Sequence, residues 1–184
     1  GWIDCSLSEK GKDEAKKAGK IFHRHHLLFD IVYCSELKRT LETYEAIAAE
    51  YSEYQNTELR KSGELNERNY GQLQGKNKDE VVKEYGEEQA HIWRRSYDVA
   101  PPGGESLKDT EERTTHLFET EVKPLLLEGK KILIIAHGNS LRALMRYLEN
   151  IPVEKIQHVE ISTGQSILYR FNEDFSIRQK EILQ

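Results

Sequence analysis

An apolar run that ends at a histidine and passes directly into a helix constrains this chain more than any other segment. Residues 132–136 read ILIIA without polar alternation, which predicts a strand covered on both faces, as in a parallel sheet between helices. His137 is then expected at the carboxyl end of that strand. Gly138 and Asn139 would open the next helix, where free backbone amides and the helix dipole favour an anion. The apolar face of that helix follows the spacing of Leu141, Leu144, Met145 and Leu148.

The composition of the chain limits its domain number, its cellular compartment and the kinds of partner that it can bind. The chain has 184 residues, of which 37% are hydrophobic, and this is enough for one substantial core, so we expect a single domain over residues 1–184. The formal net charge of −5 argues against a nucleic-acid or membrane surface as the main partner. Cys5 and Cys34 show no CxxC spacing, which favours a reducing cytoplasm over a disulfide scaffold or a zinc site. No apolar run approaches a membrane span, no signal peptide is recognised before Gly1, and the oligomeric state stays open.

Helical and extended patterns alternate along the chain. Ser8 can cap a helix that runs to about Leu28, and Gly164 would form a turn between two strands. The expected helices cover residues 8–28, 37–51, 78–86, 87–97 and 106–127, and the one after His137; the expected strands cover 29–34, 132–136, 159–162 and 166–171. This order predicts a three-layer α/β/α sandwich with a largely parallel sheet.

Several charged groups lie where phosphoryl transfer would use them. Arg39, in SELKRT, follows a strand, at the sheet edge where α/β folds gather ligands. Glu67, in LNERNYG, is a possible proton shuttle, and the adjacent Arg94 and Arg95 suit a carboxylate or phosphate. Taken singly, each would more often be a solvated surface charge. The cluster at positions 23, 25 and 26 offers two imidazoles at helical spacing, but no carboxylate or cysteine nearby completes a ligand set, so no metal site is predicted.

Together, the segments GWIDCSLSEKG, SELKRT, LNERNYGQLQGKNK, WRRSYDVAPPGGESLKD and AHGNSLRAL resemble the 2,3-bisphosphoglycerate-dependent phosphoglycerate mutases of the histidine phosphatase superfamily. The resemblance covers essentially the whole chain in order. It implies an isomerase of glycolysis and gluconeogenesis that interconverts 3-phosphoglycerate and 2-phosphoglycerate through a phosphohistidine enzyme. The primer would be 2,3-bisphosphoglycerate, and no metal would take part.

The resemblance also implies roles for particular residues. Glu67 matches the general acid and base, and His137 matches a second active-site histidine that stabilises charge on the phosphoryl group. Arg39 matches an arginine on the same phosphoryl group. The remaining matches to the substrate site are Gly1, Arg68, Asn69, Tyr70, Lys78, Arg94, Arg95, Gly138 and Asn139.

One family feature does not appear in this sequence. The family carries its phosphorylated histidine in an Arg-His-Gly motif on a first strand shortly before the Gly-Trp pair, and this sequence opens at that pair. Since that strand lies inside the family's sheet, omitting it would leave its neighbours about 9 to 10 Å apart rather than roughly 4.8 Å. We therefore expect a longer natural protein, and we expect the 184-residue chain by itself to be inactive as a mutase. The alternatives are a phosphatase of the same superfamily and, if the chain truly starts at Gly1, a non-catalytic anion-binding protein.

Overall fold

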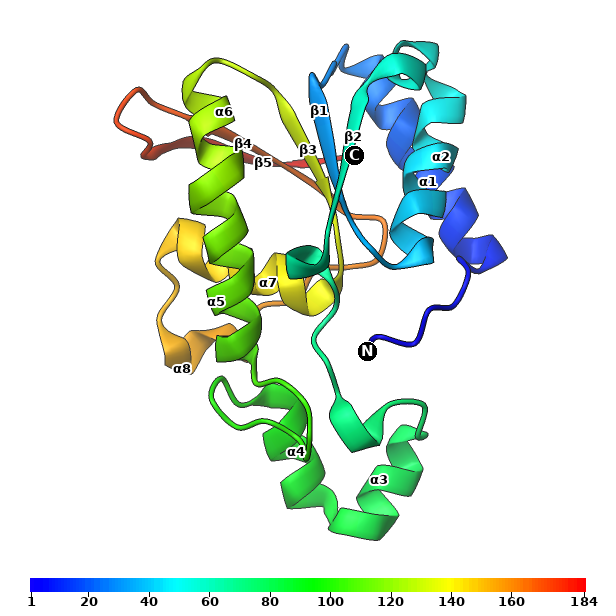
Figure 1. The fold of residues 1–184 in the computed structure, drawn as a ribbon, viewed down its shortest axis with the longest axis vertical. Helices are drawn as coiled ribbons and strands as arrows, with labels where there is room; N and C mark the ends of the chain where they lie inside the picture. Colours follow the sequence, from blue (N-terminus) through cyan, green and yellow to red (C-terminus); the bar gives the residue numbers. More distant parts are fainter.

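The computed structural model describes residues 1–184, apart from the side chains of Gln55 and Asn56. Its centre is a parallel sheet in the order β2-β1-β3, with β1 at Ile31–Ser35, β2 at Glu58–Ser62 and β3 at Ile132–Ile135. A separate antiparallel hairpin pairs β4, Ser166–Phe171, with β5, Ile177–Leu183. Figure 1 shows the parallel strands between two groups of helices. This arrangement confirms the predicted α/β sandwich.

The two faces of β1 explain the layers. Val32 and Cys34 pack in one core with helices α1, Glu9–Arg24, and α2, Lys38–Glu50. The alternate residues Ile31 and Tyr33 pack in a second core with the helices that follow residue 106. All five residues of β1 are buried, and each fully buried apolar side chain contributes on the order of 1.5–3 kcal/mol. Because β1 is buried on both faces, the residues that follow its carboxyl end are held in fixed positions.

The second helical layer is nearly continuous in sequence. It consists of α5 (Leu107–Leu117), a π-helical turn (Phe118–Val122), α6 (Lys123–Leu127) and α7 (Gly138–Glu149). The predicted helix over 106–127 is therefore confirmed in extent, with a π turn just before Pro124, whose missing N–H cannot continue the regular hydrogen-bond ladder. A short helix, α8 (Val153–Ile156), follows α7.

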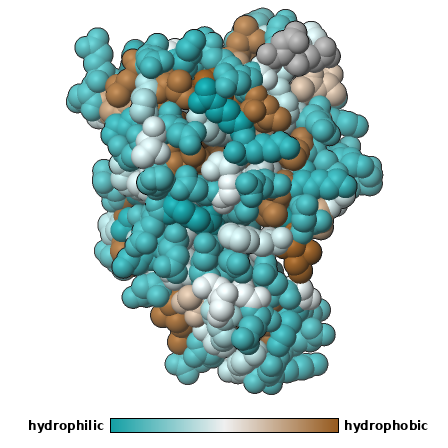
Figure 2. Space-filling view, in the orientation of Figure 1, coloured by the Kyte–Doolittle hydropathy of each residue, from teal (hydrophilic) through white to brown (hydrophobic). Residues whose placement is uncertain are grey.

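Two further helices extend the molecule beyond the carboxyl ends of the strands. They are α3, Lys78–Tyr85, and α4, Glu87–Arg95, and they meet at Gly86, whose φ of 84° ends the first helix. In Figure 1 they form the lower part of the molecule, and the N-terminus lies between them and the sheet. The face in Figure 2 is mostly hydrophilic around this lower part, with hydrophobic side chains gathered mainly over the sandwich.

Several local predictions were wrong. The first helix ends at Arg24 rather than near Leu28, because His26 takes a φ of 49° and the Leu27 N–H bonds back to Phe22. The segment 159–162 is not a strand, and β4 pairs instead with β5, which sequence patterning missed. Strand β2 was also missed, since its ELRKS sequence is mostly charged.

Strand β3 differs from its prediction in burial. Ile132, Leu133 and Ile134 are half-buried, and only Ile135 is fully buried, although both faces were expected to be covered. The reason is its position: in the sheet that the described residues form, β3 pairs with β1 on one side and lies at the edge. Strand β4 likewise pairs only with β5, yet Leu133 and Leu168 pack against the same core, so the two sheets share side-chain contacts.

Candidate active site

Two parallel strands deliver the first residues of the site to one edge of the sheet. Cys34 lies opposite Ile135 in the β1–β3 ladder, so Ser35 and His137 emerge together at the carboxyl ends. Arg39 lies in the first turn of α2, just beyond β1, as the sequence predicted. The parallel arrangement therefore brings together residues about one hundred positions apart in sequence.

His137 is buried and held from both ring nitrogens. Arg39 Nε donates to His137 Nδ1 at 3.2 Å, and His137 Nε2 lies 2.8 Å from Ser35 Oγ. Because Nδ1 accepts a bond, the neutral ring carries its proton on Nε2 and donates to Ser35. Burial, followed by the charge of Arg39, lowers the pKa of His137 to about 3. The ring is therefore neutral at physiological pH.

Ser35 was missed by sequence reasoning, although it ends a predicted buried strand. Its hydroxyl also accepts from the Leu37 N–H at 3.1 Å and lies 2.9 Å from the Thr40 hydroxyl. Thr40 Oγ1 in turn bonds to the Leu37 carbonyl at 2.8 Å. This buried hydroxyl pair fixes the orientation of the imidazole. A serine at the carboxyl end of the strand neighbouring that of His137 is the signal that could have identified it.

Arg39 also holds the first residues of the chain. Its Nη2 donates to the Gly1 carbonyl and its Nη1 to the Ile3 carbonyl, both at 3.0 Å. The sequence placed Gly1 at the pocket edge, and the structure places its backbone beside Arg39. Cys5 is exposed nearby, with its Sγ 4.0 Å from Arg39 Nη1.

Glu67 lies on the loop after β2 and reaches the start of α7. Its Oε1 accepts from the backbone N–H of Arg68 at 2.7 Å and of Asn139 at 3.1 Å. Its Oε2 lies 4.0 Å from the point where a Cβ on Gly138 would be. The expected anion cradle at the helix N-terminus is therefore partly engaged by this carboxylate. Sequence reasoning missed Arg113, whose Nη2 donates to the Glu67 carbonyl at 3.1 Å and which pairs with a carboxylate at position 105.

A second chain of contacts leads from Asn139 deeper into the protein. Asn139 Nδ2 donates to Tyr70 Oη at 3.1 Å, and Arg142 Nη2 donates to Asn139 Oδ1 at 2.8 Å. The guanidinium carbon of Arg68 lies 4.6 Å from the centre of the Tyr70 ring. Burial, followed by the positive charge of Arg68, lowers the pKa of Arg142. Sequence reasoning did not single out Arg142.

The side chains of four predicted substrate residues take no part in the hydrogen bonds of this network, although the charge of Arg95 contributes to lowering the pKa of Arg142. Lys78 and Arg94 are exposed on α3 and α4, and Arg95 donates to Glu160 and the Gln157 carbonyl, both at 3.3 Å. Asn69 caps the Gly71 N–H at 2.8 Å. Among the described side chains, no hydrogen bond joins these four side chains to His137, Arg39 or Glu67. The arginine pair predicted to lie together thus separates, one side chain exposed and the other turned to the segment after α8.

The histidine cluster of the first helix has a packing role at one position. His23 stacks on Tyr51 with ring centres 4.6 Å apart. Within the part of the chain that the structure describes, no three His, Cys, Asp or Glu side chains gather closely enough to hold a metal ion.

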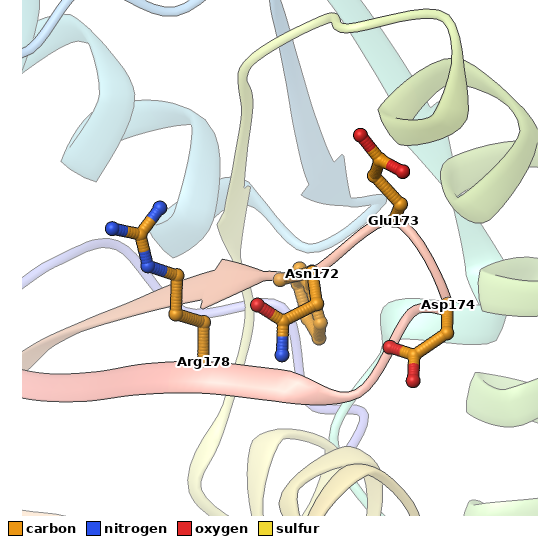
Figure 3. A pocket seen from close by; sticks show the side chains of 5 residues that line it. Asn172, Glu173, Asp174 and Arg178 are labelled. Atoms are coloured by element: carbon orange, nitrogen blue, oxygen red, sulfur yellow. The ribbon is translucent and has the colours of Figure 1, made fainter.

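A roughly 520 Å³ hollow lies at the β4–β5 turn, away from His137. Phe171, Asn172, Glu173, Asp174 and Arg178 line it. Figure 3 shows that the labelled side chains fan out from the turn rather than converge on one point. Asp174 bonds to Ser176 at 2.6 Å, which closes the turn locally. The hollow is therefore formed by the shape of the turn, and its described side chains do not converge as catalytic groups would.

The sequence profile of the Histidine phosphatase superfamily (branch 1) matches residues 1–179. A "2,3-bisphosphoglycerate-dependent phosphoglycerate mutase" of Parvibaculum lavamentivorans is 44% identical over 183 residues, which cover 100% of this chain and 87% of that protein. The chain belongs to the histidine phosphatase superfamily. Within the superfamily, it is also similar to a "Phosphoglycerate mutase" of Schizosaccharomyces pombe, at 47% identity over 100% of this chain and 86% of the relative.

Solved structures share the fold of this chain. The Bacillus stearothermophilus protein YhfR matches with a TM-score of 0.83 at 23% identity, covering 97% of this chain and 84% of that one. A mycobacterial glucosyl-3-phosphoglycerate phosphatase matches with a TM-score of 0.76 at 22% identity, covering 99% and 88%. In the described part of this superfamily member, no helix has the length and apolar character needed to cross a membrane.

Proposed function

We propose that this protein interconverts 3-phosphoglycerate and 2-phosphoglycerate as a cytoplasmic, single-domain, 2,3-bisphosphoglycerate-dependent mutase. The observation that carries the proposal is the position of Glu67. Its carboxylate accepts from the Asn139 N–H at the N-terminus of α7, two residues after His137, and the His137 ring accepts from Arg39. Moving a phosphoryl group between two hydroxyls requires a group beside the phosphoryl site that accepts and returns a proton. The identity of 44% to 47% with proteins named as mutases supports the same assignment.

The site residues fit a polyanionic primer. Buried nitrogens of two guanidiniums, Nε and Nη1 of Arg68 and Nε of Arg142, have no hydrogen-bond partner among the described residues. Such nitrogens match the oxygens of a phosphate or carboxylate. Arg39, Arg68 and Asn139 would hold 2,3-bisphosphoglycerate, which supplies a phosphoryl group when bound.

The chain's own residues then divide the work. Arg39 carries the charge that attracts the phosphoryl group, and a phosphoryl oxygen competes with His137 Nδ1 for the Arg39 N–H. Once Nδ1 is released, the negative phosphoryl group raises the pKa of His137, so Nδ1 takes up a proton from solvent while Nε2 keeps its own. His137 then donates a hydrogen bond from Nδ1 to the group in flight. Glu67 takes the proton of the attacking hydroxyl and returns it to the leaving oxygen.

The assignment can be tested with a fusion. The 184-residue chain is extended before Gly1 with the segment of a mutase relative that carries the Arg-His-Gly motif, and is supplied with 3-phosphoglycerate and 2,3-bisphosphoglycerate. We expect 2-phosphoglycerate to form faster than inorganic phosphate. Glu67→Gln in the same fusion should lower turnover by about 10²- to 10⁴-fold.

The outcomes separate the alternatives. Phosphate release in excess of isomer formation would favour a phosphatase, and binding without either product would favour a non-catalytic protein. The unextended chain should show no turnover. Acid-labile phosphate on His137 together with turnover of that chain would contradict this expectation.

A further inference from the structure

The loop that carries Glu67 has little regular structure of its own. Residues 66–70 belong to no helix or strand, so no backbone ladder fixes the direction of the Glu67 side chain. Arg113, on α5, reaches this loop, and 16% of its side chain is exposed. Each of its three guanidinium nitrogens donates to a protein acceptor, whereas Arg68 and Arg142 keep nitrogens without a partner among the described residues. The Arg113 guanidinium is therefore engaged by the protein itself.

Arg113 holds the peptide group that supports the Glu67 carboxylate. Its Nη2 donates to the Glu67 carbonyl at 3.1 Å, and the indole of Trp2 donates to the same oxygen. The N–H of that same peptide group, which belongs to Arg68, donates to Glu67 Oε1 at 2.7 Å. Because a peptide group is planar, fixing the direction of its carbonyl also fixes the direction of its N–H. Arg113 therefore sets the direction from which the backbone holds the Glu67 carboxylate.

Glu105 completes the support on the other side of Glu67. Its two carboxylate oxygens accept from Nε and Nη2 of Arg113, each at 3.0 Å, which is the paired geometry of a guanidinium with a carboxylate. Glu105 Oε2 also accepts from the Asn69 N–H at 2.8 Å, and the Glu105 N–H donates to the Asn69 carbonyl at 2.7 Å. Arg113 Nη1 in turn donates to the Glu64 carbonyl. The ion pair thus holds the backbone on both sides of the Glu67 side chain.

We propose that Arg113, together with Glu105, is a positioning residue for Glu67 and keeps its carboxylate against the start of α7. This inference rests on the proposed function, in which Glu67 transfers protons, and adds a residue that acts through Glu67 and not through the substrate. A lysine at position 113 would supply the charge from a single nitrogen, which cannot reach both carbonyls and both oxygens of Glu105 at once. A displacement of about 1 Å in a reacting group can lower a rate about 10²-fold, so the support of Glu67 matters to the reaction.

The first experiment asks whether Arg113 acts through Glu67. Turnover is measured in the fusion that tests the proposed function, unmodified and with Arg113→Met, Glu67→Gln or both. We expect Arg113→Met to lower kcat about ten- to hundredfold with KM within about twofold, because the proton transfer is made only in the transition state. In the Glu67→Gln background the same change should lower kcat by less than about twofold, since the group that it positions is gone. Arg113→Lys should give an intermediate kcat.

The matched control is a second ion pair that involves α5. Arg146 Nη1, on α7, lies 2.7 Å from Glu111 Oε1, on α5, with 20% and 12% of the two side chains exposed. Among the described residues, neither side chain forms a hydrogen bond with the loop at 66–70. Arg146→Met should therefore lower the free energy of unfolding about as much as Arg113→Met does, and leave kcat within about twofold.

The second experiment needs no turnover. The Asn139 N–H donates to Glu67 Oε1, so its chemical shift in the amide NMR spectrum of the 184-residue chain reports the position of that carboxylate. We expect Arg113→Met to move this shift toward its value in Glu67→Ala, and Arg146→Met to leave it in place. Arg113→Lys, which retains the charge, serves the same comparison if Arg113→Met does not fold.

The outcomes separate a positioning role from a merely structural one. An equal loss of kcat with and without Glu67 would overturn the inference, and so would an Asn139 shift that the Arg113 variants leave unchanged. If the unmodified fusion formed no 2-phosphoglycerate, the proposed function would fail. The Asn139 shift would still decide whether Arg113 positions Glu67.

Discussion

The His137 network and the Arg68–Arg142 pair are neighbours, and they differ in how far their polar groups are satisfied. Around His137, both ring nitrogens have protein partners, and the pKa is low enough to keep the ring neutral. Arg142 donates to Asn139 through Nη2, but its Nε and two nitrogens of Arg68 have no partner among the described residues, and the charge of Arg68 helps to lower the pKa of Arg142. The hydrogen bonds of the His137 ring are complete without a ligand, whereas the two arginines have N–H donors that a ligand can satisfy. We infer that the His137 network orients His137 and Arg39 toward the phosphoryl group, and that the Arg68–Arg142 pair adds affinity for an anion.

The pH dependence of stability offers the largest test of this difference. The unfolded chain takes up a proton on His137 below about pH 6.5, but the folded chain does so only near pH 3. Stability from this residue is thus present above pH 6.5 and is lost as the pH falls toward 3. Between pH 7 and 4.5 we expect a loss of about 3 kcal/mol.

Urea unfolding of the chain and of His137→Gln at both pH values isolates this contribution from the carboxylates. The difference in unfolding free energy between the two proteins should change by that amount with pH. A constant difference would show that His137 is not held neutral in the folded state.

Removing the partner of His137 is expected to have a somewhat smaller effect. Ser35→Ala leaves the Nε2–H of His137 and the Leu37 N–H without their acceptor. We expect a loss of about 2 kcal/mol in the free energy of unfolding, because a buried donor loses its bond. Ser162→Ala, on the surface, is the matched control. If Ser35→Ala lowered the free energy of unfolding no more than the control does, Ser35 would not be the hydrogen-bond partner of His137.

The smallest expected effect on stability is at Arg68, and the test is whether its replacement raises or lowers the free energy of unfolding. Arg68→Met removes a buried charge with two unpaired nitrogens, so we expect unfolding free energy to stay level or rise by about 1 kcal/mol. Binding of 3-phosphoglycerate should weaken at the same time. Arg24→Met on exposed α1 is the control. A clear loss of stability would show that packing on Tyr70 outweighs the buried charge.

Sequence patterning predicted that His137 and Arg39 lie near each other because the signals for both are local. The run into His137 lies in one segment, and Arg39 follows a strand within a few positions, so strand ends alone predict their meeting. Glu67 could be assigned only through the resemblance, since a lone glutamate in a loop has no periodicity. The structure then showed that its carboxylate reaches Asn139.

Arg142 could not be identified in the same way. It lies one turn into α7, where an arginine between apolar positions is typical of a solvated helix face. Its surroundings include the charged groups of Arg68 and Tyr70, more than seventy positions earlier, and such tertiary neighbours leave no mark in local spacing. Strand β5 was missed for a related reason: IRQKEIL is mostly polar, and only its pairing with β4 makes it a strand.

The edges of β3 and β4 have a consequence for the behaviour of this polypeptide in solution. In the described sheets, each strand offers one row of backbone N–H and C=O groups without a neighbouring strand, and Ile132 and Ile134 are half-buried there. Such edges are templates for pairing with another chain. The 184-residue polypeptide should therefore self-associate as its concentration rises, despite its net charge of −5, and light scattering should detect this. An extended peptide that pairs with β3 should compete with that association. The solubility of the polypeptide would therefore depend on the backbone groups of this one strand edge.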